Sequence, residues 1–171
     1  MGIFVVSDLH LNHNKDFLYK PRGFETIEEH DEQIIANWND VVAPDDIVFL
    51  LGDLMMGGDF DAGIAKLKRL NGIICHIRGN HDTDNKMARY TELTHYTCLG
   101  WADTVNYKKW RFFMCHYPVM INNYPPENKK FCLHGHTHHS NRLEYIHSKN
   151  IIHRDIKPSN IMITKKAFGR L

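Results

Sequence analysis

The feature of this sequence that most constrains its fold is a short apolar run followed at once by residues that bind metal ions or phosphate. This arrangement occurs five times, with apolar runs at residues 3–7, 47–51, 73–77, 111–115 and 130–134. The segments that end these runs are Asp8-Leu9-His10, Gly52-Asp53, Gly79-Asn80-His81-Asp82, Cys115-His116 and Gly135-His136-Thr137-His138. Because ligand sites of open α/β sheets lie beyond the carboxyl ends of the strands, these segments are expected to meet in one crevice.

Helical patterns separate the first three apolar runs. Thr26 and Glu29 have the spacing of a capping box, and an apolar stripe continues from there up to Pro44. A second helix is expected over 60–70, and Gly72 follows it. The alternation of strands and helices predicts an α/β fold with parallel strands and helical crossovers. After about residue 100 the pattern changes: a hairpin over 104–107 and 111–115 and a strand over 130–134 are expected.

The composition fits one globular domain. The chain has 171 residues, and its 21 Lys and Arg nearly balance its 20 Asp and Glu, which disfavours a disordered chain and a wholly basic nucleic-acid binder. The longest apolar run, 47–51, is far shorter than the ~20 residues of a membrane helix, so no membrane association is expected. Four cysteines without a Cys-x-x-Cys pair, and no secretory signal, predict reduced thiols and a cytoplasmic protein.

Histidine is over-represented, with 13 residues that cluster along the chain. Asp8 and His10, like His136 and His138, are two residues apart, so in an extended backbone the members of each pair face the same side. Together with Asp53 and an asparagine and a histidine from the other segments, they are too many ligands for one tetrahedral zinc ion and enough for two first-row metal ions. Mixed oxygen and imidazole ligands favour manganese, our first choice, or iron, zinc or nickel over magnesium and calcium.

The motifs Asp-x-His, Gly-Asp, Gly-Asn-His-Asp, a later His and Gly-His-x-His, in this order, resemble those of the calcineurin-like metallophosphoesterase superfamily over residues 1–140. The resemblance implies a four-layer α/β/β/α sandwich, here with an atypical C-terminal edge. It also implies two divalent metal ions bridged by Asp53. One ion would be bound by Asp8, His10 and His138, and the other by Asn80, His116 and His136.

The same resemblance implies that His81 faces the substrate phosphate, and we expect Asp82 to orient His81 in catalysis. The expected reaction is hydrolysis of a phosphodiester or phosphomonoester by in-line attack of metal-bound hydroxide. A small molecule or nucleotide is the expected substrate, because residues 1–140 contain 14 basic and 18 acidic residues, and this charge does not indicate nucleic acid. Two alternatives remain open: a nuclease acting on DNA or RNA, and a non-catalytic protein-binding scaffold with the same fold. The sequence patterns do not indicate whether the protein is a monomer or an oligomer.

Several residues beside these motifs have a structural interpretation as well as a functional one. Cys115 adjoins His116, but neighbouring strand residues face opposite sides, so a buried thiol is expected rather than a nucleophile. His30, His76 and His95 are expected to be packing or surface residues. Contacts with the metal ligands remain an alternative to plain packing for His13, His134 and His139.

The C-terminal segment differs from the rest of the chain. Residues 141–171 contain 7 basic and 2 acidic residues, and residues 143–166 resemble the catalytic loop of protein kinases, closest to the casein-kinase group. That resemblance implies a catalytic base at Asp155, a magnesium ligand at Asn160 and a phosphate contact at Lys157. No glycine-rich phosphate loop or Asp-Phe-Gly motif accompanies it, so kinase activity is not expected. We therefore predict a phosphoesterase domain over 1–140 and a tail over 141–171 that is not an independent domain.

Overall fold

A computed structural model describes residues 1–119 and 130–136 of the chain. A four-residue helix, α1 (Asp16–Tyr19), and a 3₁₀ turn, η1 (Lys20–Arg22), follow the first strand. The longer helices are α2 (Ile27–Val41), α3 (Phe60–Leu67) and α4 (Asp84–Tyr90). The strands are β1 (Ile3–Val6), β2 (Ile47–Leu51), β3 (Ile73–Ile77), β4 (Tyr96–Gly100), β5 (Ala102–Tyr107), β6 (Trp110–Cys115) and β7 (Lys130–Leu133).

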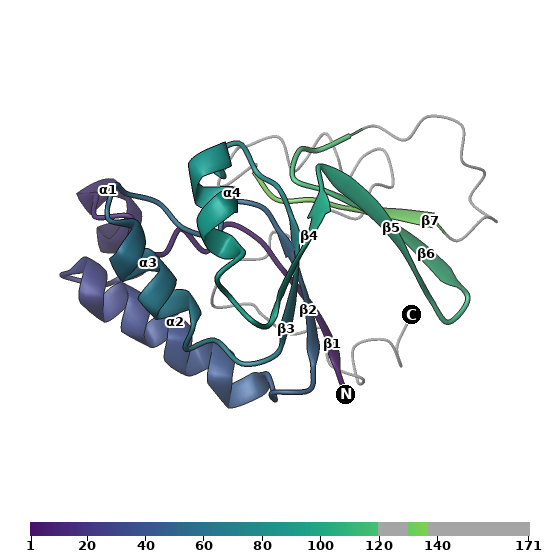
Figure 1. The fold of residues 1–171 in the computed structure, drawn as a ribbon, viewed down its shortest axis with the longest axis horizontal. Helices are drawn as coiled ribbons and strands as arrows, with labels where there is room; N and C mark the ends of the chain where they lie inside the picture. The colour runs from purple at the N-terminus through teal and green to yellow at the C-terminus, as the bar shows by residue number, and fades with distance from the viewer. Residues whose placement is uncertain (120–129, 137–171) are drawn as a thin grey trace.

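The first four strands form one parallel sheet in the order β1-β2-β3-β4. Helices α2, α3 and α4 lie on one side of this sheet, and the second sheet lies on its other side (Figure 1). The parallel pairing and the helical crossovers confirm the α/β interpretation of the sequence. The strands predicted at 47–51 and 73–77 have the same bounds in the structure.

The second sheet has the order β5-β6-β7. Strands β5 and β6 are an antiparallel hairpin, as predicted, and β7 pairs with β6 in parallel. The described residues thus form three of the four expected layers, helices and two sheets. In the described part of the chain, no helix covers the outer face of β5–β7, and none is long and apolar enough to cross a membrane.

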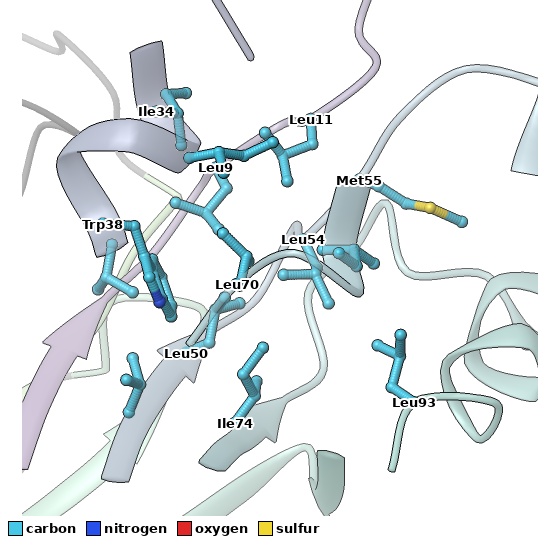
Figure 2. Close-up of a cluster of buried hydrophobic side chains, with 14 of the residues drawn as sticks. Leu9, Leu11, Ile34, Trp38, Leu50, Leu54, Met55, Leu70, Ile74 and Leu93 are labelled. Atoms are coloured by element: carbon cyan, nitrogen blue, oxygen red, sulfur yellow. The ribbon is translucent and has the colours of Figure 1, made fainter. Parts of the chain in front are cut away.

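Apolar side chains cover both faces of the first sheet. On the helix side, Trp38 of α2 packs with Val48 and Leu50 of β2, in a cluster that Figure 2 shows in part. On the other side, Phe49 and Met114 belong to a smaller cluster between the two sheets. The alternation of residues between the two clusters explains why the strands appear in the sequence as continuous apolar runs.

Two local features differ from the sequence analysis. The Thr26 hydroxyl accepts a hydrogen bond from Glu29 N–H (3.2 Å), as in a capping box, but the Glu29 carboxylate accepts from Glu25 N–H (3.0 Å) instead of from Thr26. The sequence pattern also predicts no element over 84–100, where the structure has α4 and β4. Strand β4 was missed because it is an edge strand with partly exposed side chains, so it has no apolar run.

Candidate metal centre

The candidate ligands lie at one edge of the first sheet because β1, β2 and β3 run parallel and end there. The loops after β1 and β2 continue the strand pairing beyond the sheet. Asp8 N–H donates to Gly52 O (3.0 Å), and His10 N–H donates to Asp53 O (3.1 Å). This backbone pairing holds the Asp-x-His segment directly against the Gly-Asp segment.

Apolar side chains anchor these loops in the helix-side core. Leu9 and Leu11 alternate with the ligands in the loop after β1, and Leu54 and Met55 follow Asp53 in the loop after β2. All four side chains are fully buried, and Figure 2 shows them in the cluster with α2 and β2. Because the apolar side chains of these loops point into the core, the polar side chains that alternate with them point toward the site.

The first ligand group consists of Asp8, His10 and Asp53, whose candidate ligand atoms all lie within 4.8 Å of one another. His10 Nε2 lies 3.7 Å from Asp8 Oδ1 and 3.9 Å from Asp53 Oδ2. All three residues are buried. Three candidate ligands predicted from the sequence are thus brought together in the loops after two neighbouring strands.

The second ligand group consists of Asn80, His116 and His136. His116 Nε2 lies 2.8 Å from Asn80 Oδ1 and 3.2 Å from His136 Nδ1, and His136 Nδ1 lies 3.0 Å from Asn80 Oδ1. Asp53 Oδ2 is 3.5 Å from His116 Nε2 and therefore lies between the two groups. His138, the remaining predicted ligand, lies outside the described residues.

The atoms that converge in the second group are electron-pair donors. His116 Nδ1–H donates to the carbonyl oxygen of Leu51 (2.8 Å), so the lone pair of this imidazole is at Nε2, which faces Asn80 Oδ1. Burial, and then the neighbouring His116, lower the pKa of His136, which favours its neutral form with a free lone pair. Lone pairs this close repel one another unless a cation lies between them, so the donor set fits a metal ion.

The spacing of the donors fits a metal ion as well. Ligand atoms about 2.0–2.2 Å from a first-row metal ion lie roughly 3.0–3.5 Å from one another. The distances in the second group fall at or just below this range, and those in the first group are slightly longer.

Each carboxylate of the site is held through one oxygen and faces the other ligands with the second. Asp8 Oδ2 accepts from the Ser7 hydroxyl (2.6 Å) and from His136 N–H (3.1 Å), and Asp8 Oδ1 faces His10. Asp53 Oδ1 accepts from His81 N–H (2.9 Å), which leaves Oδ2 facing both ligand groups. Ser7 was not singled out in the sequence, where it appears as the last residue of an apolar run.

The backbone of the site is crowded and strained. A Cβ atom at Gly135 would lie 2.6 Å from Asp8 Oδ2, and one at Gly79 would lie 2.6 Å from Asp53 N, so these positions require glycine. Several ligands adopt the left-handed conformation, which costs on the order of 1–3 kcal/mol for a residue other than glycine. They are Asp8 (φ 55°), His10 (φ 52°), Asp53 (φ 58°) and His136 (φ 69°).

His81 lies at the rim of this site with an exposed side chain. Its ring centroid is 5.8 Å from that of His10. The backbone of His81 is tied to the site through the hydrogen bond to Asp53 Oδ1. His81 is therefore next to the ligands, and its imidazole faces solvent.

Asp82 has a different environment from the one expected. We predicted that it orients His81, but the carboxylate of Asp82 is buried, and none of its hydrogen bonds within the described ranges reaches the His81 imidazole. It accepts hydrogen bonds from Asp53 N–H (2.8 Å), Leu54 N–H (3.3 Å), Gly79 N–H (2.8 Å) and the Tyr90 hydroxyl (3.0 Å). Burial alone would raise the pKa of Asp82, but His76, whose Nε2 lies 3.1 Å away, and these amides hold the pKa well below its usual value.

The other histidines and Cys115 mostly have structural environments. His30 and His76 are fully buried, as the packing interpretation predicts. His13 packs beside the first ligand group, with its ring centroid 5.6 Å from that of His10. His134 Nδ1–H donates to Gly135 O (2.9 Å), and His139 lies outside the described residues. Cys115 is buried, as predicted, with its thiol donating to Tyr117 O (2.9 Å).

Comparisons with known proteins agree with this architecture. The family model of the calcineurin-like phosphoesterases matches residues 1–164. The uncharacterized protein MJ1445 of Methanocaldococcus jannaschii is 34% identical over 143 residues, which are 83% of this chain and 72% of that protein. The gene 66 protein of Mycobacterium phage L5 is 26% identical over 194 aligned positions, covering 96% of this chain and 86% of that protein.

A solved structure shares the fold. AQ665 of Aquifex aeolicus, described as a protein of unknown function, superimposes with a TM-score of 0.67 at 20% identity, over 90% of this chain and 88% of that one. Together, the fold, the ligand cluster and the family match define a metal-dependent phosphoric ester hydrolase. The chain belongs to the calcineurin-like phosphoesterase family, whose members bind divalent metal ions.

Proposed function

We propose that this protein is a two-metal phosphodiesterase that acts on small molecules or nucleotides. Asp8 and His10 bind one ion, together with His138 by the family resemblance, and Asn80, His116 and His136 bind the other. Asp53 bridges the two ions. The observation that supports this proposal most directly is the position of Asp53 Oδ2, 3.9 Å from His10 Nε2 and 3.5 Å from His116 Nε2.

When bound, the two cations would activate a water molecule for in-line attack and neutralise charge on the phosphoryl oxygens. The protein's own residues would orient the ester and donate a proton to it. His81 suits the second task because its imidazole is exposed while its backbone is fixed to Asp53. We assign it the donation of a proton or hydrogen bond to the leaving or phosphoryl oxygen.

His81 can be tested separately from the metal ligands. The H81A and H81Q variants should lower kcat by roughly 10²- to 10⁴-fold, the usual contribution of general acid–base catalysis, with the bound metal retained. Metal content measured by elemental analysis on the same samples is the control. Loss of metal in step with activity would contradict this division of roles.

An exposed aromatic side chain beside Arg78 favours nucleotide esters among the small substrates. Trp101, in the turn between β4 and β5, is 59% exposed, and the Arg78 guanidinium carbon lies 4.6 Å from the centroid of its ring. Arg78 Nε–H donates to Asp82 O (2.7 Å), so the pair adjoins the loop that carries His81. An exposed indole at this position can stack a nucleobase, which contributes about 1–3 kcal/mol per base.

Metal reconstitution tests the catalytic proposal. Metal-free protein is loaded with manganese, iron, zinc, nickel or magnesium and assayed with bis-p-nitrophenyl phosphate and p-nitrophenyl phosphate. We expect two bound equivalents, the highest rate with manganese, and faster hydrolysis of the diester than of the monoester. A folded protein that binds no metal and hydrolyses neither ester would support the scaffold alternative instead.

A pair of diesters tests the substrate class. Thymidine 5′-(p-nitrophenyl phosphate) and methyl p-nitrophenyl phosphate have the same leaving group and differ in the nucleoside. W101A should raise KM about 5- to 100-fold for the nucleoside ester, as expected from a lost stacking interaction, and leave the methyl ester unchanged. W101F, which keeps an aromatic ring, is the matched control. Equal effects on both esters would remove the argument for a nucleotide.

A further inference from the structure

A lysine outside the predicted motifs joins the two loops at the centre of the site. Lys86 lies on α4 and is 6% exposed. Its ammonium donates to Met55 O (2.9 Å) in the loop after β2, and to His81 O (2.8 Å) in the loop after β3. One buried cation therefore binds a carbonyl group from each loop.

Asp82 binds the same two loops through the opposite kind of group. Its carboxylate accepts from the N–H groups of Asp53 and Leu54 after β2, and of Gly79 after β3. Asp82 and Lys86 are four residues apart, at the beginning of α4. We call this pair the Asp82–Lys86 clasp: an anion that binds amide groups and a cation that binds carbonyl groups, each from both loops.

The clasp fixes the path of the backbone between the metal ligands and His81. Asp82 holds the amide of Asp53, Asp53 Oδ1 holds the amide of His81, and Lys86 holds the carbonyl of His81. Both peptide groups of His81 are thus bound, although its imidazole is exposed. Movement of His81 relative to Asp53 would break at least one of these hydrogen bonds.

Packing alone does not require a charge at position 86. Burial of an ammonium group is unfavourable unless other groups compensate, and apolar residues of similar size fill such positions without this cost. Here the two carbonyl oxygens and the negative charges of Asp82 and Asp53 compensate. Burial lowers the pKa of Lys86, and these two carboxylates oppose that shift.

We propose that Lys86 is a positioning residue that, with Asp82, holds His81 at a fixed place relative to Asp53. This inference rests on the proposed role of His81 in catalysis. The Lys86 ammonium donates to two backbone carbonyl oxygens, so its loss should lower the rate of the step that His81 assists and leave metal binding intact.

The test compares K86M with K86R and with a control on the same helix. K86M keeps the length of the side chain and removes the charge, whereas K86R retains a cation with several donors. R89M is the control, because Arg89 binds Asp61 and Glu92 and, among the described residues, contacts neither site loop. We expect K86M to lower kcat roughly 10- to 100-fold with little change in KM or manganese content, and K86R to recover part of that loss.

Two further measurements separate positioning from general destabilisation. In a series of aryl methyl phosphodiesters, K86M should slow the poorer leaving groups most, because these depend most on proton donation by His81. The double variant K86M/H81A should be no slower than H81A alone, because Lys86 acts through His81. R89M should show neither effect.

Several results would overturn the proposal. They are an equal loss of kcat for every leaving group, full additivity with H81A, and a loss of manganese in proportion to the loss of activity. Amide hydrogen exchange distinguishes this failure from that of the proposed function. Faster exchange of the His81 amide in K86M than in R89M would support positioning even in a protein that hydrolyses none of the esters, and unchanged exchange would contradict it.

Discussion

The two candidate ligand groups of the proposed metal centre are built in different ways. Asp8, His10 and Asp53 come from loops after two adjacent parallel strands, and the backbone hydrogen bonds between these loops already bring them together. In the second group, Asn80 follows β3 of the first sheet, whereas His116 and His136 follow β6 and β7 of the second sheet. The first group therefore depends on pairing within one sheet, and the second depends on how two sheets pack against each other.

Contacts between the sheets locate the second group. The hydrogen bond from His116 Nδ1–H to Leu51 O links β6 to β2, and His136 N–H donates to Asp8 Oδ2 across the site. Gly52 has no side chain where the His116 ring approaches it. The second group is thus the part of the centre that should respond to changes in sheet packing.

Asp53 is common to both groups, so its substitution should have the largest effect. D53N keeps the size of the side chain and removes the charge that the two proposed ions would share. We expect both manganese equivalents to be weakened and kcat/KM to fall by about 10⁴-fold or more, since two-metal stabilisation contributes several kcal/mol to the transition state. Manganese titration followed by electron paramagnetic resonance, with steady-state rates on the same sample, measures both. Wild-type stoichiometry and rate would exclude a bridging role.

Substitution of one histidine from each group should separate the two sites. H10Q should remove the ion of the first group and H116Q that of the second, each with one equivalent retained and activity lowered by roughly 10³-fold. The measurement is the number of steps in a manganese titration of each variant. If either variant lost both ions while its far-ultraviolet circular dichroism was unchanged, the two groups would not be separate sites.

Loosening the contact between the sheets should affect the second group selectively. Met114 of β6 is fully buried between the sheets, and M114A should lower the free energy of unfolding by about 2–5 kcal/mol. The matched control is L67A, at a fully buried position on the helix side of the first sheet. We expect M114A to weaken manganese binding at the second ligand group more than at the first, and L67A to change manganese binding at both groups equally. If M114A and L67A changed manganese affinity at the two groups in the same way, the second group would not depend specifically on the packing between the sheets.

The smallest effect is expected for residues of the kinase-like segment, which belong to neither ligand group. D155A and N160A should leave metal stoichiometry and diesterase rates unchanged within error, and no phosphate transfer from ATP is expected. Rates with bis-p-nitrophenyl phosphate and a radiolabelled ATP assay provide the check. A substantial loss of diesterase activity in either variant would contradict our separation of residues 141–171 from the catalytic domain.

The sequence predicted those parts of the fold that local patterns determine. Strands β2 and β3 are buried on both faces and therefore appear as apolar runs, and Thr26 defines the beginning of α2 by its cap. Helix α4 and the edge strand β4 were missed because few of their side chains are buried, so neither segment has a clear apolar pattern.

In the site, too, features that depend on local sequence motifs were predicted and features that depend on contacts between distant segments were not. The residue types and their order were sufficient to select the candidate ligands that the structure brings together. The environments of Asp82 and Lys86 were not predictable, because each depends on amide or carbonyl groups about 30 residues earlier in the chain. In the sequence, a helical lysine looks like a solvent-exposed side chain, and an aspartate after His81 looks like its partner. Only the meeting of the β2 and β3 loops gives these two residues their roles.

The left-handed backbone of the ligands limits how this protein can change. At Asp8, His10, Asp53 and His136, the positive φ angle favours asparagine, aspartate, histidine and glycine, and penalises β-branched residues such as valine and threonine. In a library of variants at these positions, β-branched substitutions should reduce the yield of folded protein. Substitutions that the backbone tolerates should change metal binding only. The residues that the backbone tolerates best include the carboxylate, amide and imidazole side chains that bind metal ions, so exchange of one metal for another is more accessible to this chain than the loss of its centre to an apolar side chain.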